Sequence, residues 1–267
     1  MTSDFERETA LDPDGDGRWT AHVSRAWNIG DNPNGGYLVA LAMQAIARLG
    51  PHQDPLTITT HFLRPGTPDA PATVEAELVR TGRTITTARA RLVQDDMTRI
   101  EVLAGFGDLT SPSAIDAGLS MPAPPEMPPP EQCLVRSGLE QGVDLPILGR
   151  LDTLIHPEQA KAGSAGTAEV SGWIRFADGR DPDSHAAVMF ADAFPPSLFG
   201  LLGYIGWVPT IELTVHVRQR PAPGWVLGRF RANDLRDGRM IEDGTLWDSA
   251  GELIAQSRQI GLLLPQE

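Results

Sequence analysis

Residues 184–218 read SHAAVMFADAFPPSLFGLLGYIGWVPTIELTVHVR, and the rest of the predicted fold is organised around this stretch. Its first part, up to Trp207, is almost wholly apolar and carries a single carboxylate, that of Asp192. An apolar run without a polar face predicts a helical element that is buried on all sides. On these grounds Asp192 fits a turn residue and a functional acid about equally well.

A membrane span is an alternative interpretation of the apolar run, because its length is sufficient. Asp192 and the pair Pro195–Pro196 count against a span, so we expect a buried helix and no membrane partner. The two prolines lack N–H groups, and the helix should therefore kink where they lie. Ser197 is then the expected N-cap of a new turn.

The second part of the stretch alternates apolar and polar residues, which predicts a half-buried strand. The residues expected to face the core are Ile211, Leu213, Val215 and Val217. The residues expected on the opposite face are Thr210, Glu212, Thr214 and His216. A buried helix with one acid, leading into a strand that begins with a threonine, is the candidate active site.

The composition of the whole chain limits its partners. Its 267 residues carry a formal charge of -13, which argues against nucleic acid or an anionic membrane. The single cysteine, Cys133, excludes an internal disulfide framework and fits a reducing cytoplasm. Residues 1–17 have neither the basic nor the apolar region of a secretory signal, so we expect a cytoplasmic protein.

The first half of the chain contains a second helical pattern. Apolar residues recur there at helical spacing, namely Leu38, Leu41, Ala42, Ala45, Ile46 and Leu49. Asn34, Gly35 and Gly36 come before them, and the glycines allow the backbone to approach another group closely. Free N–H groups at this helix start are candidate substrate-binding groups for an oxyanion or a phosphate, and a tight turn is the alternative interpretation.

Strand-like segments follow both helical patterns, and the two halves of the chain repeat one another. Residues 57–66 (TITTHFLRPG) match residues 210–224 (TIELTVHVRQRPAPG). The offset between their Arg-Pro pairs is 220 − 64 = 156, and the same offset places Asp192 opposite Gly36. Each copy is a helix followed by an antiparallel sheet, and the sheet must wrap the helix to bury it.

These copies predict an α+β fold of two tandem units that could share one continuous sheet. The expected boundaries are 1–110 for the N-terminal unit, 111–167 for a connection and 168–267 for the C-terminal unit. Residues 111–131 are rich in proline and have no period, which is typical of a semi-rigid linker. Residues 133–161 show no clear pattern, and we expect irregular structure that packs over one of the units.

Common catalytic motifs are absent from the sequence. The six histidines form neither HxH nor HExxH and there is no cysteine cluster, so we expect no metal site. The chain has no GxSxG motif and no dinucleotide fingerprint, so we expect no cofactor. The catalytic option that is left is an acid or an amide that positions water.

The order of helix and sheet, twice, with NGGYL at 34–38 and HFLRPG at 61–66, resembles the double-hotdog acyl-CoA thioesterases of the type II class. The resemblance covers residues 18–110 and 168–264, and the proline-rich linker is also similar. It implies two hotdog units, hydrolysis of an acyl-CoA-type thioester in lipid metabolism and a homo-oligomer.

In this family an Asp, a Thr or Ser and a Gln hold the attacking water. The resemblance places these roles on Asp192, Thr210 and Gln259. After the Asp the family more often has Leu-Asn-Phe-Leu, where this chain has Ala-Phe-Pro-Pro, and the next strand lacks the usual aromatic residue and histidine. These departures bear on acyl specificity. Glu212 and His216, on the predicted face of Thr210, are rival acid–base residues.

The sequence around Gln259 agrees with a site role. Gln259 shares the predicted face of its strand with Leu253, Ala255 and Ser257, and an amide on a mostly apolar face must find partners. A core amide bonded to neighbouring backbone is the alternative. In the expected mechanism Asp192 is the general base, and N–H groups near Gly35 and Gly36 or near the helix of Asp192 hold the thioester oxygen.

The arginines that are candidates to meet CoA phosphates are Arg64, Arg83, Arg218, Arg220 and Arg239, and a solvated surface is the alternative for each. Two other functions stay open. One is a non-catalytic protein that binds acyl-CoA or another small apolar ligand. The other is a hotdog hydratase or dehydratase, which commonly needs a histidine paired with an acid, and no such motif is evident.

Overall fold

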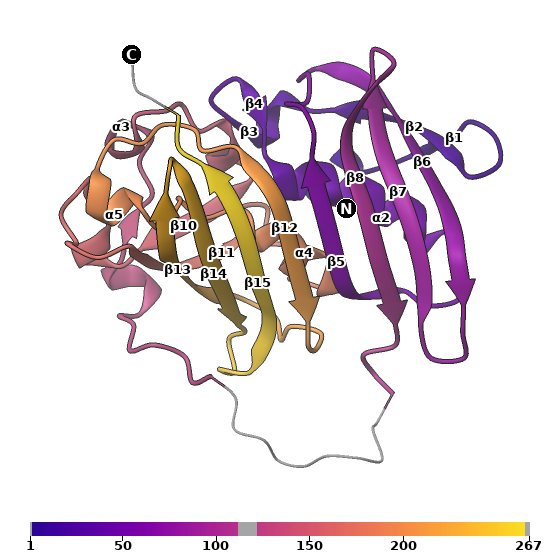
Figure 1. Cartoon of the computed structure of the whole chain (residues 1–267). Helices are drawn as coiled ribbons and strands as arrows, with labels where there is room; N and C mark the ends of the chain where they lie inside the picture. Colours follow the sequence, from indigo (N-terminus) through magenta and orange to yellow (C-terminus); the bar gives the residue numbers. More distant parts are fainter. Residues whose placement is uncertain (1, 112–121, 265–267) are drawn as a thin grey trace.

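The computed structural model describes residues 2–111 and 122–264 of the chain. Within them, thirteen strands form one antiparallel sheet in the order β1-β2-β6-β7-β8-β5-β12-β15-β14-β13-β11-β10-β9, and β3 and β4 form a separate ladder. Figure 1 shows this sheet as a continuous curved surface, with the N-terminal strands on one side and the C-terminal strands on the other.

The strands of the first half are β1 (Asp12–Pro13), β2 (Arg18–Val23), β3 (Asn28–Ile29), β4 (Asn32–Pro33), β5 (Asp54–Phe62), β6 (Ala70–Thr81), β7 (Thr86–Gln94) and β8 (Met97–Gly107). Those of the second half are β9 (Leu134–Val135), β10 (Leu151–Ile155), β11 (Glu169–Phe176), β12 (Thr210–Val217), β13 (Val226–Arg236), β14 (Arg239–Trp247) and β15 (Leu253–Leu262). The α-helices are α1 (Asp4–Glu8), α2 (Gly35–Ala47), α3 (Gly138–Gln141), α4 (Ser184–Phe190) and α5 (Phe199–Leu202). The 3-10 helices are η1 (Arg25–Trp27), η2 (Pro130–Gln132), η3 (Pro146–Gly149) and η4 (Pro157–Gln159).

The two halves of the sheet join at β5 and β12. Thr59 pairs with Thr214, and Ile58 pairs with Val215. In the repeat, residues 58 and 59 correspond to residues 214 and 215, because 214 − 58 and 215 − 59 both equal 156. The repeat therefore converts each of these pairs into the other. The side chains of Thr59 and Thr214 also share a hydrogen bond of 3.0 Å. The predicted continuous sheet is therefore confirmed, and the repeat read from the strands matches the local two-fold symmetry at this seam.

The offset does not extend to the helices. Helix α2 begins at Gly35 and α4 at Ser184, which are 184 − 35 = 149 residues apart. Because α4 ends at Phe190, Asp192 lies just after a helix whereas Gly36 lies at the start of one. The expected equivalence of Asp192 and Gly36 is therefore wrong, and their actual relation is direct contact.

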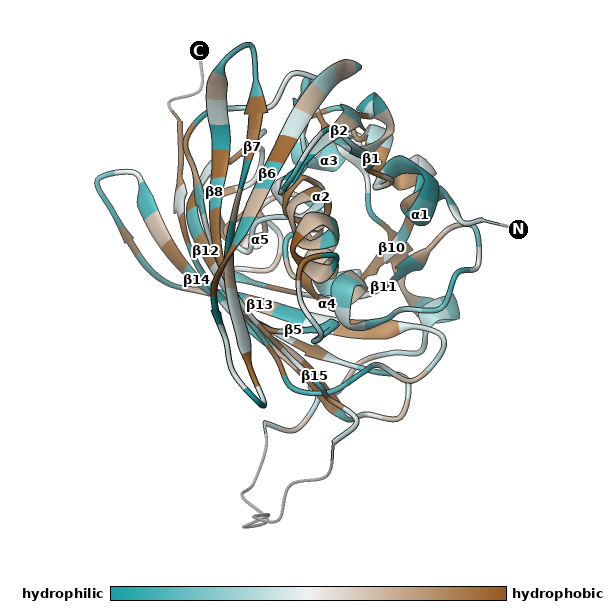
Figure 2. Cartoon of the chain, turned by 90° about the vertical axis from the view of Figure 1, so that its right-hand side faces the viewer, coloured by the Kyte–Doolittle hydropathy of each residue, from teal (hydrophilic) through white to brown (hydrophobic). Residues whose placement is uncertain are grey.

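Helix α2 lies inside the curve of the sheet with α4 beside it (Figure 2). Ten of its thirteen residues are buried, because strands β6 and β7 cover one side and α4 covers another. The Asn34 side chain caps the helix by accepting a hydrogen bond of 3.0 Å from the N–H of Tyr37. The apolar residues that recur at helical spacing predicted this helix, and protein covers most of its surface.

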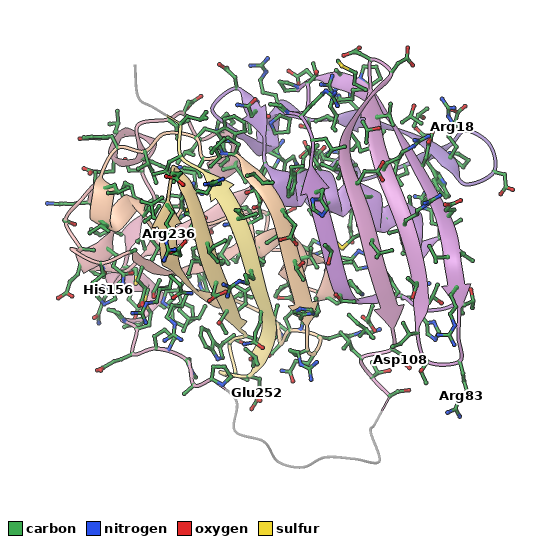
Figure 3. The ribbon with its side chains drawn as sticks, viewed as in Figure 1. Arg18, Arg83, Asp108, His156, Arg236 and Glu252 are labelled. Atoms are coloured by element: carbon green, nitrogen blue, oxygen red, sulfur yellow. The ribbon has the colours of Figure 1, made fainter. Side chains whose placement is uncertain are left out.

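Figure 3 shows the opposite face of the sheet covered by side chains, with Arg18 and Arg236 near its two ends. This face carries the ion pairs between Arg91 and Glu75 and between Arg258 and Asp243. One face of the sheet therefore holds the core and the other is polar, as in other antiparallel sheets with helices on one side.

The apolar run breaks into two short helices, α4 and α5, around Pro195 and Pro196, as the missing N–H groups predict. The expected N-cap role of Ser197 is wrong, because the N-cap of α5 is Leu198 and no side chain caps it. The Ser197 N–H instead donates to the carboxylate of Glu242 at 2.6 Å. None of the helices in residues 2–111 and 122–264 is long and apolar enough to cross a bilayer.

The predicted alternation of β12 fails at its first residues. The pairing with β15 shifts between Thr210 and Glu212, so Ile211 is an extra residue in the ladder and its side chain is 39% exposed. A bulge of one residue inverts the alternation before it. Thr210 therefore points to the core side, where its hydroxyl bonds Gln259, and the prediction that it shares a face with Glu212 and His216 was wrong.

The connection between the halves is more ordered than its sequence indicated. Strands β9 and β10, within residues 133–161, extend the sheet beyond β11. Of the proline-rich linker, residues 112–121 lie outside the described residues. Its second part lies against the C-terminal sheet, because Trp247 and Trp173 donate from their indole N–H groups to the carbonyls of Pro122 and Pro128, at 2.9 and 2.8 Å.

A buried carboxylate at the start of β5 ties the halves together. Asp54 is 3% exposed and accepts two hydrogen bonds of 2.9 Å from Arg220, one of 2.8 Å from Ser184 and one of 3.0 Å from the N–H of Leu109. Arg220 and Ser184 belong to the second half of the chain. The Asp54 carboxylate thus joins β5 to the start of α4 and to the turn after β12.

We expect Asp54→Asn to lower the free energy of unfolding by about 1–3 kcal/mol, because the amide cannot accept all four hydrogen bonds and leaves a charge-assisted pair unmade. Urea unfolding followed by circular dichroism measures this change. Asp237→Asn, in the exposed turn before β14, is the matched control and should change the value by less than about 0.5 kcal/mol. Equal effects of the two substitutions would contradict the assigned role of Asp54.

Candidate active site

The three residues predicted to form the site line one cavity of about 230 Å³. Asp192 comes from the segment after α4, Thr210 from the first residue of β12 and Gln259 from β15. Asn34 and Gly35, at the start of α2, line the same cavity. The structure thus brings together groups from both halves of the chain.

The Asp192 carboxylate is held by the start of helix α2. Its Oδ2 accepts a hydrogen bond of 2.7 Å from the N–H of Gly36 and one of 3.0 Å from Nδ2 of Asn34. The same Nδ2 lies 2.8 Å from the carbonyl of Asp192, a carbonyl that the proline pair leaves without a helical partner. A helix N-terminus favours an anion at this place.

The two glycines are required by this close approach. A Cβ on Gly35 would lie 2.9 Å from Oδ2 of Asp192, and a Cβ on Gly36 would lie 2.8 Å from the carbonyl of Met189. Both distances are shorter than packed carbon and oxygen atoms tolerate. The Asn34-Gly35-Gly36 segment therefore binds and makes room for the Asp192 carboxylate. The Gly36 N–H, which was predicted to bind substrate, is already bonded to this carboxylate.

Burial raises the pKa of Asp192 to about 7. The Gly36 N–H and Asn34 act in the opposite direction, while the nearby carboxylate of Glu242 raises the value further. A carboxyl group with a pKa near 7 can both accept and release a proton close to neutral pH. This is the property that a general base in this cavity needs.

Thr210 and Gln259 form a directed pair. The Thr210 hydroxyl donates to Oε1 of Gln259 at 2.9 Å, and Nε2 of Gln259 donates to Oε1 of Glu242 at 2.6 Å. The predicted core-side face of Gln259 is confirmed, because Leu213 and Glu242 pair with it from the two neighbouring strands. Its amide therefore bonds side chains at the cavity. Leu253, which was expected on this face, lies on the opposite one with Trp247, beyond a shift in the pairing with β14.

The sequence interpretation missed two groups of this cavity. Glu242 is 2% exposed, and Arg136 is 4% exposed. Period-two alternation in RMIEDGTLW would have shown Glu242 on the same face as the buried Met240 and Leu246. No local pattern marks Arg136, because it follows the short strand β9 and reaches the site through tertiary packing.

Arg136 fixes the segment after Asp192. Its Nη1 donates to the carbonyl of Ala193 at 2.8 Å, and its Nε and Nη2 both donate to Oε1 of Gln141, at 3.0 and 2.7 Å. None of the ion pairs found among the described residues includes Arg136. Burial lowers the pKa of this guanidinium to about 9, so it stays charged at neutral pH.

The arginines proposed to meet phosphates have different surroundings. Arg64 lines the cavity. Arg220 bonds the buried Asp54, and Arg239 pairs with the exposed Asp237 in its own turn. The position of Arg64 fits a contact with a ligand that extends out of the cavity, whereas Arg220 has a structural bond.

Two domain profiles match the chain and together cover most of it. The profile of the acyl-CoA thioesterase N-terminal domain matches residues 23–107, and that of the acyl-CoA thioesterase C-terminal domain matches residues 121–263. The chain belongs to the acyl-CoA thioesterase family. Its fold is a double hotdog, as the resemblance predicted, and solved structures of similar proteins confirm this.

Three solved structures illustrate the likeness. A Thermobifida fusca protein described as a candidate thioesterase II is 28% identical, with a TM-score of 0.86 over 99% of this chain and 98% of that one. A protein of unknown function with a hotdog fold, from Alicyclobacillus acidocaldarius, is 26% identical, with a TM-score of 0.81 over 100% of both chains. The acyl-CoA thioesterase II TesB2 of Mycobacterium marinum is 20% identical, with a TM-score of 0.74 over 98% of this chain and 99% of that one, and shows the fold alone.

The raised pKa of Asp192 predicts a specific pH dependence of stability. Between the ordinary value of 3.8 and about 7, the folded chain binds a proton at Asp192 that the unfolded chain has released, so this group lowers stability as pH rises. We expect the free energy of unfolding of Asp192→Asn, relative to wild type, to increase from pH 5 to pH 8.

Urea unfolding at both pH values measures this difference. Asp152→Asn, at a partly exposed carboxylate of β10 that pairs with Arg175, is the control, and its difference from wild type should stay nearly constant. A difference for Asp192→Asn that is the same at pH 5 and pH 8 would show that the burial of Asp192 does not raise its pKa.

Proposed function

We propose that the protein hydrolyses acyl-CoA-type thioesters with a water molecule activated by Asp192 and positioned by Thr210 and Gln259. One observation carries this proposal: a half-buried carboxylate with a pKa near 7 shares a cavity with a hydroxyl–amide pair that keeps hydrogen-bonding capacity. Membership of the acyl-CoA thioesterase family supports the reaction class.

In the proposed reaction, ionised Asp192 takes a proton from water while the water oxygen attacks the carbonyl carbon of the thioester. The carbon–sulfur bond then breaks, and the proton passes from Asp192 to the leaving CoA thiolate. The products are a free acid and CoA. Asp192 returns to its ionised form when it gives this proton to the thiolate. The acid product loses the second proton of the water to solvent, so no other reactant is needed.

Thr210 and Gln259 have the donors and acceptors that such a water requires. The Thr210 oxygen keeps its lone pairs after it donates to Gln259, and the Gln259 amide keeps one N–H after it donates to Glu242. Thr210 lies on the core side of the sheet, with Gln259, because of the bulge at Ile211. Glu212 and His216, the rival acid–base residues, lie on the other face of the sheet and take no part in this mechanism.

The walls of the cavity suit a hydrocarbon chain. Its apolar lining includes Phe62, Phe194, Trp207, Phe230 and Leu262. The rings of Phe194 and Phe230 lie 4.8 Å apart, and Phe194 stands in the Ala-Phe-Pro-Pro segment that departs from the usual family sequence. We propose that this ring pair limits the acyl length, and that Arg64 contacts the CoA portion outside the cavity.

We expect Asp192→Asn to reduce kcat for acyl-CoA hydrolysis by about 100-fold to 10,000-fold, because the amide cannot accept the proton of water. In the wild type, kcat/KM should rise with pH through a midpoint near 7, since the ionised acid is the active form. Release of free CoA thiol from a panel of acyl-CoAs, recorded between pH 5 and 9, measures both quantities.

Asp152→Asn is the matched control and should keep wild-type activity. Equal rates for Asp192→Asn and wild type would remove Asp192 from the mechanism. If the wild type binds acyl-CoA without releasing thiol, the alternative of a non-catalytic binding protein takes its place, and hydration of an enoyl-CoA would favour the hydratase alternative. Cytoplasmic location and self-association stay predictions, and the latter is tested by sedimentation.

A further inference from the structure

We propose that Glu242 is a positioning residue of this site, because its carboxylate fixes which end of the Gln259 amide faces Thr210 and which end serves the attacking water. This inference rests on the proposed function and adds to it a residue outside the Asp192, Thr210 and Gln259 set. Glu242 lies on β14, directly opposite Gln259 in the sheet, and its side chain lines the cavity.

The argument begins with the donors and acceptors of the amide. A carboxylate only accepts hydrogen bonds, so the nitrogen of Gln259 must face Glu242, at 2.6 Å. The amide oxygen must then face Thr210, whose hydroxyl has one proton and gives it to this oxygen at 2.9 Å. Glu242, Gln259 and Thr210 thus form a row joined by two hydrogen bonds. With Glu242 ionised, the direction of both hydrogen bonds is determined.

The same constraint decides what the row presents to the cavity. Thr210 is left with an oxygen that can only accept, and Gln259 is left with one free N–H that can only donate. If the amide turned around, its oxygen would face the Glu242 carboxylate and the two groups would repel. Glu242 thus excludes the reversed amide, in which Thr210 would be free to donate its proton elsewhere.

Glu242 is itself held in place by the break in the apolar helix. Its Oε2 accepts a hydrogen bond of 2.6 Å from the N–H of Ser197, the residue that follows Pro195 and Pro196. The proline pair stops α4, and the N–H of Ser197 turns toward β14. The helix break therefore anchors the row of hydrogen bonds that ends at Thr210.

Glu242 also acts on Asp192 through its charge. Glu242 is buried, Asp192 is half-buried, and both line one cavity. Each has a raised pKa, first of all because of desolvation. The charged groups that bear on the pair are Arg136 and Arg64, which line the same cavity, and Asp243, which acts on Glu242 from the next position of β14. Removal of the Glu242 charge should lower the pKa of Asp192 toward its ordinary value.

The test is Glu242→Gln, which keeps the size of the side chain and removes its charge. The new amide accepts from Ser197 only by turning its NH₂ group toward Gln259, and Gln259 must then reverse. We expect kcat to fall about 10-fold or more while KM changes less than about 3-fold, because the acyl chain is bound elsewhere. The acid limb of kcat/KM should move to lower pH by about one unit.

A shift of the acid limb to lower pH separates this role from a merely structural one, since general loosening of the site does not ionise Asp192 more easily. Glu242→Asp is the second variant: it keeps the charge, so its acid limb should stay near that of wild type while kcat falls. Glu212→Gln, which replaces a carboxylate two residues from Thr210 on β12, is the control and should match wild type throughout.

The inference is overturned if Glu242→Gln keeps wild-type kcat, or if its acid limb stays in place or moves to higher pH. If Glu242→Gln does not fold, a Glu242→Asp variant with wild-type kcat overturns it equally. A wild type that hydrolyses no acyl-CoA would instead remove the proposed function and this inference with it. Wild-type activity that is insensitive to residue 242 would remove the inference alone.

Discussion

The contact between the start of helix α2 and the carboxylate of Asp192 is the interaction on which the site depends. The Gly36 N–H and the Asn34 amide hold one oxygen of this half-buried carboxylate. An isolated buried carboxylate would be costly, and the helix N-terminus offsets part of that cost. What is left of this cost raises the pKa of Asp192, and the proposed role of Asp192 as a base depends on that raised value.

This contact explains why two similar halves form one site. The N-terminal half supplies donors, through α2, and the C-terminal half supplies the acid, the hydroxyl and the amide. The seam between β5 and β12 fixes the two halves relative to one another, and the bonds of Asp54 to Arg220 and Ser184 secure the start of α4. The catalytic proposal therefore depends on the packing between halves as much as on the side chains that face the cavity.

The sequence predicted those parts that local periodicity governs. Helix α2 was predicted because apolar residues recur in it at helical spacing and protein covers most of its surface. Strand β15 alternates regularly over Ala255, Ser257 and Gln259, so the face of Gln259 was readable. The bulge at Ile211 was not readable, because one inserted residue leaves the composition of a strand unchanged while it inverts a side chain. For the same reason Thr210 was placed with Glu212.

Contacts between distant residues were the other gap. The N–H groups of the Asn34-Gly35-Gly36 segment were expected to hold a substrate oxygen. The sequence does not show that the Gly36 N–H donates to the carboxylate of Asp192, which lies 156 positions away. Arg136 was passed over since nothing near it in the chain indicates burial. The family resemblance supplied the three site residues, whereas the partners that tune them, Glu242 above all, became visible only in the folded chain.

The two edge strands of the thirteen-stranded sheet, β1 and β9, have only two residues each. One of the two residues of β1 is Pro13, which has no N–H to offer. A neighbouring chain that aligned itself with either edge strand would find few free backbone groups to bond. Short edge strands of this kind limit edge-to-edge pairing between chains.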